Sequence, residues 1–179
     1  MAYDWRVTGK KGCDVELVEE VEVARVREAE EHVVTNRAEA EMIDRAACAV
    51  HVRDFPPLVS DEPPSRGGQD RGQSPLELLL ASLCACTNVT AGRMADKLRF
   101  EYSGLEMHAE GELDTRGRRG LADVPIHYRA VRLHVTITTN EPDKRVERLA
   151  GLVARYCPVD TLMRPVVPDF EVTWERRSD

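Results

Sequence analysis

The stretch Ser74-Pro75-Leu76-Glu77-Leu78-Leu79-Leu80-Ala81-Ser82-Leu83-Cys84-Ala85-Cys86-Thr87 decides the fold, because it predicts a helix that is apolar on almost every side. Ser74 is a good N-cap, Pro75 suits the first helical position, and Glu77 completes a Ser-x-x-Glu capping box. We expect the helix to run to about Lys97 and to become polar only in its second half. A helix that is apolar all round belongs in the centre of a core.

The segments after this helix predict further strands and one more helix. Apolar and polar residues alternate over 105–109, 131–138 and 170–174, which is the period of a half-buried strand. A second helix should open near 140–142 and end at Pro158. Its apolar stripe consists of Val146, Leu149, Ala150, Val153 and Cys157. This order indicates an α+β fold, with helices packed on a largely antiparallel sheet.

The part before the helix divides into a strand-rich start, 1–60, and a loop, 61–73. The strands that we expect in the start lie at 3–7, 21–23 and 49–52, whereas 28–43 suits either a strand or a helix. The loop is rich in Gly, Pro and Asp, a composition that predicts no regular structure, and its length is typical of functional loops. We expect one domain over 1–179, with the motif-bearing part at 61–174.

Composition and charge exclude several classes of function. There are 25 Lys and Arg against 32 Asp and Glu, a formal net charge of -7, so a nucleic-acid partner is not expected. The start lacks a basic and apolar secretory signal, and the apolar run 76–91 is short for a membrane span and contains Asn88 and Thr90. We therefore expect a cytoplasmic protein without a membrane partner. An odd number of cysteines, five, favours free or transiently reacting thiols there.

Cys86 and Cys157 are the candidate reactive thiols. Cys86 lies too far from the helix N-terminus for the helix dipole to lower its pKa, and burial raises the pKa of a thiol. A reactive Cys86 therefore needs a cation from another segment, most plausibly an arginine; otherwise it is a packing residue. Cys157 continues the inner stripe of its helix, so a disulfide between the two is geometrically conceivable. Cys84 lies about 200° round the helix from Cys86 and is expected to pack.

A metal site is the weaker interpretation of the other cysteines. Cys48-x-x-His51 and Cys84-x-Cys86 supply four soft ligands in principle. Within a helix the sulfurs of Cys84 and Cys86 splay apart, so we expect no metal and no cofactor. His108 and His134 should lie on the polar face of the sheet, and no residue pattern points to a hydrolase triad.

Two motifs together resemble the OsmC/Ohr superfamily, the osmotically induced and organic hydroperoxide resistance proteins. The first motif runs from Asp61-Glu62-Pro63 through Gly67–Leu80 to Cys86-Thr87, and the second is Tyr156-Cys157-Pro158-Val159. The resemblance covers about Asp61 to Trp174. It implies an intertwined α+β homodimer, in which antiparallel sheets wrap around central helices and the active sites lie at the subunit interface.

The resemblance also implies a thiol-dependent peroxidase in oxidative-stress defence. Cys86 would attack an organic hydroperoxide as a thiolate and become a sulfenic acid. Cys157 would resolve it as a disulfide, and a dithiol such as a dihydrolipoyl group would restore both thiols. Such chemistry is sensible for a thiol pair, because a sulfenic acid beside a second thiol condenses to a disulfide.

The chain departs from the well-studied peroxidases at one position. They carry a carboxylate directly after the motif proline, paired with an activating arginine, whereas this chain has Leu76 there and Glu77 next, as the less characterised OsmC-like branch does. Glu77 is thus either a catalytic carboxylate or a capping residue. Candidates by position for the activating arginine are Arg53, Arg66, Arg71 and Arg155. Two alternatives stay open: a non-catalytic dimer that binds a small apolar or thiol-bearing molecule, and a redox sensor oxidised without turnover.

Overall fold

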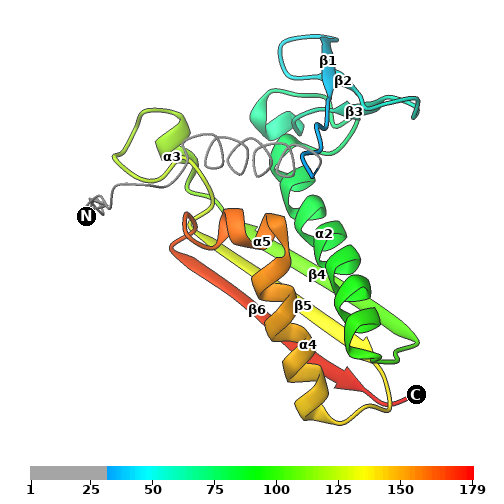
Figure 1. Ribbon diagram of the computed structural model, residues 1–179. Helices are drawn as coiled ribbons and strands as arrows, with labels where there is room; N and C mark the ends of the chain where they lie inside the picture. The colour runs from blue at the N-terminus through cyan, green and yellow to red at the C-terminus, as the bar shows by residue number, and fades with distance from the viewer. Residues whose placement is uncertain (1–31) are drawn as a thin grey trace, which may run out of the picture. The chain divides into compact units, whose positions relative to one another are not determined.

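The computed structural model describes residues 32–179 (Figure 1). The strands expected at 3–7 and 21–23, as well as Cys13, lie outside the described residues. The described residues divide into two compact units, residues 32–39 with 51–56 and residues 40–50 with 57–179. The single domain over 1–179 stays a prediction, and the features below belong mainly to the second unit.

A small sheet precedes the long helix. Its strands are β1 (Glu39–Met42), β2 (Cys48–His51) and β3 (Leu58–Ser60), in the order β1-β2-β3, and β2 pairs antiparallel with β3. The strand expected at 49–52 is confirmed. The segment 28–43, which suited either a strand or a helix, contains the strand β1 near its end. The loop that follows contains one turn of 3-10 helix, Pro64–Arg66, which its composition did not predict.

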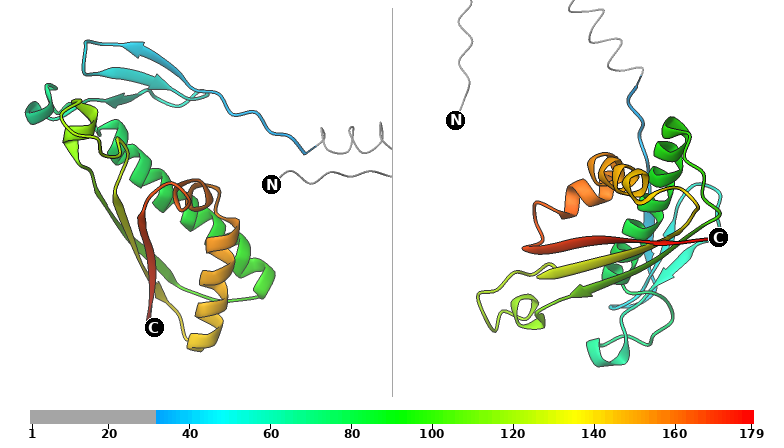
Figure 2. Two further views of the ribbon diagram at one scale, coloured as in Figure 1. Left: turned by 90° about the vertical axis from the view of Figure 1, so that its left-hand side faces the viewer. Right: turned by 90° about the horizontal axis from the view of Figure 1, so that it is seen from below.

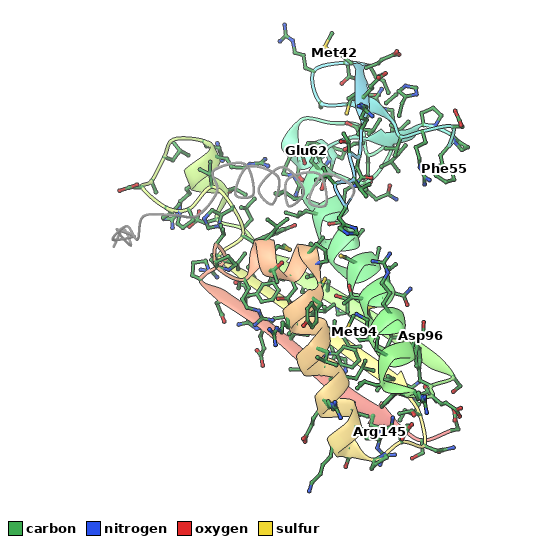
Figure 3. The ribbon with its side chains drawn as sticks, in the orientation of Figure 1. Met42, Phe55, Glu62, Met94, Asp96 and Arg145 are labelled. Atoms are coloured by element: carbon green, nitrogen blue, oxygen red, sulfur yellow. The ribbon has the colours of Figure 1, made fainter. Side chains whose placement is uncertain are left out.

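The long helix is α2 (Pro75–Leu98), with Ser74 as its N-cap, so its predicted start and end are confirmed. A side chain from outside the helix binds the carbonyl groups at its C-terminal end. Arg145 donates hydrogen bonds from Nη2 to the carbonyl oxygens of Leu98 (2.8 Å) and Arg99 (3.0 Å). A guanidinium suits this end of a helix because the carbonyls there lack partners within the helix. Figure 3 labels Arg145 and also Met94, which is buried between α2 and its neighbours.

The second sheet has the order β4-β5-β6. Its strands are β4 (Gly104–Glu112), β5 (Ala130–Thr138) and β6 (Asp169–Arg177). β4 and β5 are antiparallel, but β5 and β6 are parallel, because helices connect β5 to β6 and bring the chain back in the same direction. All three strands were expected. A one-turn helix, α3 (Thr115–Arg118), lies in the segment between β4 and β5.

Two helices connect β5 to β6, namely α4 (Asp143–Tyr156) and α5 (Pro158–Met163). Pro158 ends α4 as predicted, but it also begins α5, which was not predicted. The three helices α2, α4 and α5 lie over one face of the second sheet (Figure 2). That face is apolar, whereas His108 and His134 are exposed on the opposite face, as expected.

One expectation for α2 is not met within a single chain. The helix packs on β4, α4 and α5, yet Leu79 is 40% exposed and Val89 is 51% exposed. Its length and composition would suffice to cross a membrane, but core helices of soluble proteins meet the same criteria, and its inner face packs as such a helix does. One apolar face of α2 is therefore exposed to solvent in the single chain.

Candidate functional site

The structure brings the thiols of Cys86 and Cys157 together. Cys157 is completely buried, at 0% exposure, and Cys86 is half-buried against the same apolar cluster. The neighbouring Cys157 thiol raises the pKa of the Cys86 thiol. Both cysteines are free thiols. The structure therefore places both candidate thiols in one apolar cluster.

Helix periodicity places Cys86 at the border between two faces of α2. The inner face carries Leu83, Thr87 and Thr90, which are buried, while Ala85 and Val89 are exposed. Each residue turns the helix by about 100°, so Cys86 lies between these two sets. The thiol is therefore packed on one side and open on the other.

Cys157 owes its place to the junction between α4 and α5. The buried residues Val146, Leu149 and Val153 form the inner stripe of α4, as predicted, and Cys157 follows at the next turn. Its backbone N–H donates to the carbonyl oxygen of Val153 at 2.8 Å, and its own carbonyl accepts from the N–H of Thr161 at 3.0 Å. The junction is thus fixed from both sides.

The surroundings of Cys86 raise the pKa of its thiol. Burial is the largest influence and raises the pKa of the Cys86 thiol, and the neighbouring Cys157 raises the pKa further. The backbone N–H of Val159 and the hydroxyl of Thr90 act the other way. Among residues 32–179, the leading influences on this thiol include no cation. Within the described part of the chain, the arginine that a reactive Cys86 was expected to need is not among these influences.

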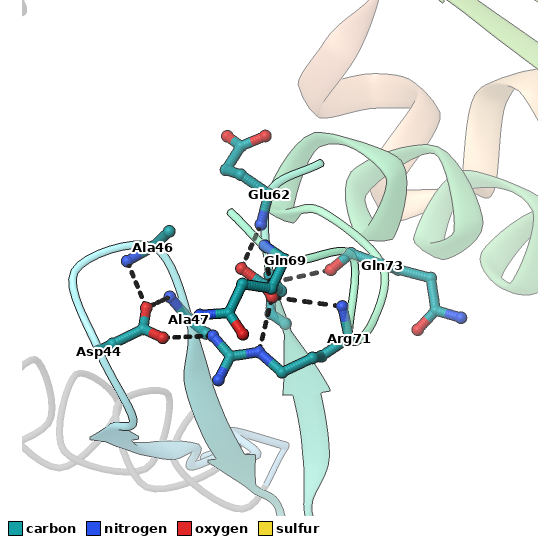
Figure 4. A network of polar contacts seen from close by, with 9 residues as sticks. Asp44, Ala46, Ala47, Glu62, Gln69, Arg71 and Gln73 are labelled. Atoms are coloured by element: carbon teal, nitrogen blue, oxygen red, sulfur yellow. Dashed lines mark hydrogen bonds and ion pairs between the residues drawn. The ribbon is translucent and has the colours of Figure 1, made fainter. Parts of the chain in front are cut away.

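Arg71 is the candidate arginine with the most complete set of partners (Figure 4). Its Nε donates to Oδ2 of Asp61 at 2.8 Å, and its Nη2 donates to Asp44. Asp61 is 1% exposed and also accepts hydrogen bonds from the backbone N–H groups of Glu62, Gln69 and Arg71. The hydrogen bond from Arg71 is the largest influence that lowers the pKa of the Asp61 carboxyl. Arg71 therefore organises the loop.

The other candidate arginines are also engaged. Arg66 forms an ion pair with Glu62. The guanidinium of Arg155 lies 5.3 Å from the ring centre of Tyr156, and within the first unit the guanidinium of Arg53 lies 4.6 Å from that of Phe55.

These features can be compared with known proteins. A family model described as OsmC-like protein matches residues 67–171. The chain belongs to the OsmC-like protein family. No curated protein is significantly similar to it.

Solved OsmC-like structures share the fold at low sequence identity. An OsmC-like protein from Mycoplasma pneumoniae is 20% identical, with a TM-score of 0.67, and the match covers 81% of this chain and 97% of that one. An organic hydroperoxide resistance protein OsmC from Legionella pneumophila is 17% identical, with a TM-score of 0.60 and coverage of 80% and 98%. OhrB of Bacillus subtilis is 16% identical, with a TM-score of 0.56 and coverage of 79% and 98%.

Glu77 of this OsmC-like chain acts as a capping residue. Its Oε2 accepts the backbone N–H of Ser74 at 2.7 Å, and this hydrogen bond is the largest influence lowering the pKa of Glu77. The capping interpretation is confirmed. A catalytic role for Glu77 stays a prediction, with its carboxylate already engaged at the N-terminus of α2.

Cys84 packs with the apolar cluster around Leu83, away from the cluster that holds Cys157, as its helical position predicted. Within 32–179, no group of three or more Cys, His, Asp or Glu side chains is arranged to hold a metal.

Thr87 and Thr90 were not singled out in the sequence, although Thr90 follows Cys86 by four residues, the spacing that puts side chains on one helix face.

Proposed function

We propose that the chain is a cytoplasmic thiol-dependent peroxidase that reduces organic hydroperoxides, with Cys86 as the attacking thiol and Cys157 as the resolving thiol. The observation that carries the proposal is that these two free thiols lie in one apolar cluster, where Cys157 influences the pKa of Cys86. Membership of the OsmC-like family supports a role in peroxide resistance.

The chemistry balances with a dithiol as the only co-substrate. The Cys86 thiolate attacks the distal oxygen of ROOH, the O–O bond breaks, and the alkoxide takes a proton to leave as ROH. The resulting sulfenic acid condenses with the Cys157 thiol, which releases water and forms the disulfide. A dithiol such as a dihydrolipoyl group then exchanges with this disulfide and leaves in its oxidised cyclic form.

The burial of the two cysteines supports their order in the reaction. Cys86 is half-buried on the border of an open apolar face, whereas Cys157 is 0% exposed. A hydroperoxide can therefore reach Cys86 first, and the apolar surroundings favour an organic substrate over hydrogen peroxide.

The open face of α2 supports a homodimer. Ala81, Ala85 and Val89 are exposed, and small side chains allow another helix to approach closely. A second copy that covers this face would shield Cys86 from water and could bring the cation that one chain lacks. An all-round apolar helix is explained in this way.

Mass spectrometry after one equivalent of tert-butyl hydroperoxide tests the proposal. We expect a disulfide between Cys86 and Cys157 in the unaltered chain and loss of peroxide consumption in Cys86→Ser. Cys84→Ser is the matched control, because it removes a half-buried thiol from the same helix and should leave turnover intact. Two reduced cysteines after the peroxide treatment would exclude the mechanism.

A second candidate is a redox sensor that is oxidised without turnover, favoured because no cation of residues 32–179 is among the leading influences on Cys86. It would form the same disulfide, but with excess dithiol it would not consume hydroperoxide catalytically. Steady-state peroxide consumption therefore separates the two functions.

A further inference from the structure

We propose that α5 is a lid that shuts the Cys157 thiol off from external reagents, and that Arg164 is the residue that holds this lid closed. A closed lid reserves Cys157 for the sulfenic acid of Cys86, so its use in catalysis rests on the proposed function. The lid itself can be tested without any peroxide, because it controls how easily a reagent reaches the Cys157 sulfur.

The fold encloses Cys157 between three helices. The residue is 0% exposed, and its carbonyl oxygen accepts hydrogen bonds from the backbone N–H and from Oγ1 of Thr161, both at 3.0 Å. α5 packs on α2 and α4, and Val159 packs against the apolar cluster that contains Cys157. On the α2 side, Oγ1 of Thr87 lies 4.0 Å from Sγ of Cys157. A reagent can therefore reach this sulfur only when one of the three helices moves.

α5 is the helix that opens at the least cost. It has six residues, whereas α2 has 24 and α4 has 14. So short a helix is not stable by itself and depends on its tertiary contacts. Its buried residues are Asp160 and Met163, and the first of these is an ionisable group that water solvates better than a protein interior does. Local opening of α5 is therefore the easiest route to Cys157.

Arg164 makes the burial of Asp160 possible. The Asp160 side chain is 4% exposed, and Nε and Nη2 of Arg164 each donate to one of its carboxylate oxygens at 2.8 Å. Among residues 32–179, these are the only hydrogen bonds to that carboxylate. The guanidinium also lies 4.8 Å from the ring centre of Phe170 in β6. A buried carboxylate is tolerated when it is paired in this bidentate way, so the closed lid depends on Arg164.

The same ion pair says how the lid can be opened. Without the guanidinium, the Asp160 carboxylate would be unpaired in the closed state but hydrated in the open state. Loss of Arg164 therefore favours opening, because it destabilises only the closed state. Loss of the Asp160 charge at the same time should cancel much of this effect, since a neutral amide costs less to bury than a carboxylate. If Arg164 acted through its bulk alone, there would be no such cancellation.

The experiment measures alkylation of the reduced chain by iodoacetamide at fixed pH, with mass spectrometry of the peptide that carries Cys157. Arg164→Gln should speed alkylation of Cys157 about tenfold. Arg164→Lys keeps the charge but not the bidentate pair, so it should give a smaller acceleration. Asp160→Asn combined with Arg164→Gln should return the rate toward that of the unaltered chain. Arg176→Gln is the matched control: it removes the 2.5 Å hydrogen bond from Nε to Asp143, between β6 and α4, and should leave the rate unchanged.

The half-buried Cys84 is the internal reference, because it packs in the other apolar cluster. An unchanged Cys157 rate in Arg164→Gln would overturn the inference. Equal acceleration of Cys84 would also overturn it, since the whole chain would then be unfolding, and so would a double variant that reacts as fast as Arg164→Gln. If Arg164→Gln does not fold, Arg164→Lys decides by the same criteria. If the unaltered chain consumes no hydroperoxide, the proposed function fails, while the alkylation rates still decide whether α5 is a lid.

Discussion

Asp61 is the buried carboxylate on which the loop before α2 depends. It accepts hydrogen bonds from three backbone N–H groups and from the side chain of Arg71. A buried carboxylate is tolerated only when it is paired and hydrogen-bonded, and this loop supplies both conditions. The aspartate and arginine of the first motif are thereby explained as parts of one folded loop.

Substitution of Asp61 should change the acid stability of the protein. The folded pKa of Asp61 lies below its ordinary value of 3.8, so its contribution to stability is present above that value and is lost as pH falls through the folded pKa. Asp61→Asn should destabilise the fold at pH 7 more than Asp44→Asn does, because the Asp61 side chain is buried whereas that of Asp44 is 39% exposed, and should flatten the loss of stability in acid. Urea unfolding from pH 7 down to about pH 3 checks this. Equal effects of the two variants would contradict it.

Tyr128 carries a simpler prediction. It is 5% exposed, and its hydroxyl donates to the carbonyl oxygen of Leu76 at 2.9 Å, so the segment just before β5 is tied to the first turn of α2. Tyr128→Phe should lower the free energy of unfolding by about 1 kcal/mol, the usual net value of one hydrogen bond. Chemical denaturation measures this, and an unchanged midpoint would show that water replaces the hydroxyl at no cost.

At the scale of elements, two glycines have opposite roles. A Cβ on Gly72 would lie 2.0 Å from the carbonyl oxygen of Val59, because the loop passes directly over β3. A Cβ on Gly151, in the exposed side of α4, would meet nothing within 4 Å.

We therefore expect Gly72→Ala to destabilise the fold by about 2 kcal/mol and Gly151→Ala to stabilise it by about 1 kcal/mol. The thermal midpoints of the two variants give the measurement, with each serving as the control for the other. A stabilised Gly72→Ala would mean that the loop does not lie against β3.

The elements differ in how well the sequence predicts them, for physical reasons. The capping box and the apolar run predict α2, and the alternation of apolar and polar residues predicts β4, β5 and β6, because these signals are local. The six-residue α5 is too short to show a helical period, and the parallel pairing of β6 depends on a crossover that no local pattern encodes. The site follows the same rule: the two cysteines were found by motif, while the partners of each arginine and the threonines beside the thiols depend on tertiary packing.

At the scale of the whole molecule, the open face of α2 is the feature that one chain leaves unexplained. Ala85 lies on that face, next to the half-buried Cys86. A charged side chain there would have to be buried by a second copy, which is costly without a partner charge.

Ala85→Glu should therefore convert a dimer into a monomer, and it should slow peroxide consumption in parallel. Sedimentation velocity measures the first effect. Arg148→Glu, on an exposed part of α4, is the control and should leave the dimer intact. An unaltered sedimentation coefficient for Ala85→Glu would show that this face is not the subunit interface.

The anchored backbone of Cys157 has a consequence for the oxidation cycle. The N–H and carbonyl groups of Cys157 already form hydrogen bonds with neighbouring turns. Closure of a disulfide must therefore come from rotation about side-chain bonds, chiefly at Cys86. Crystals of the reduced form should then survive a peroxide soak without cracking. Repeated oxidation and reduction of the proposed thiol pair would then cost the molecule little reorganisation.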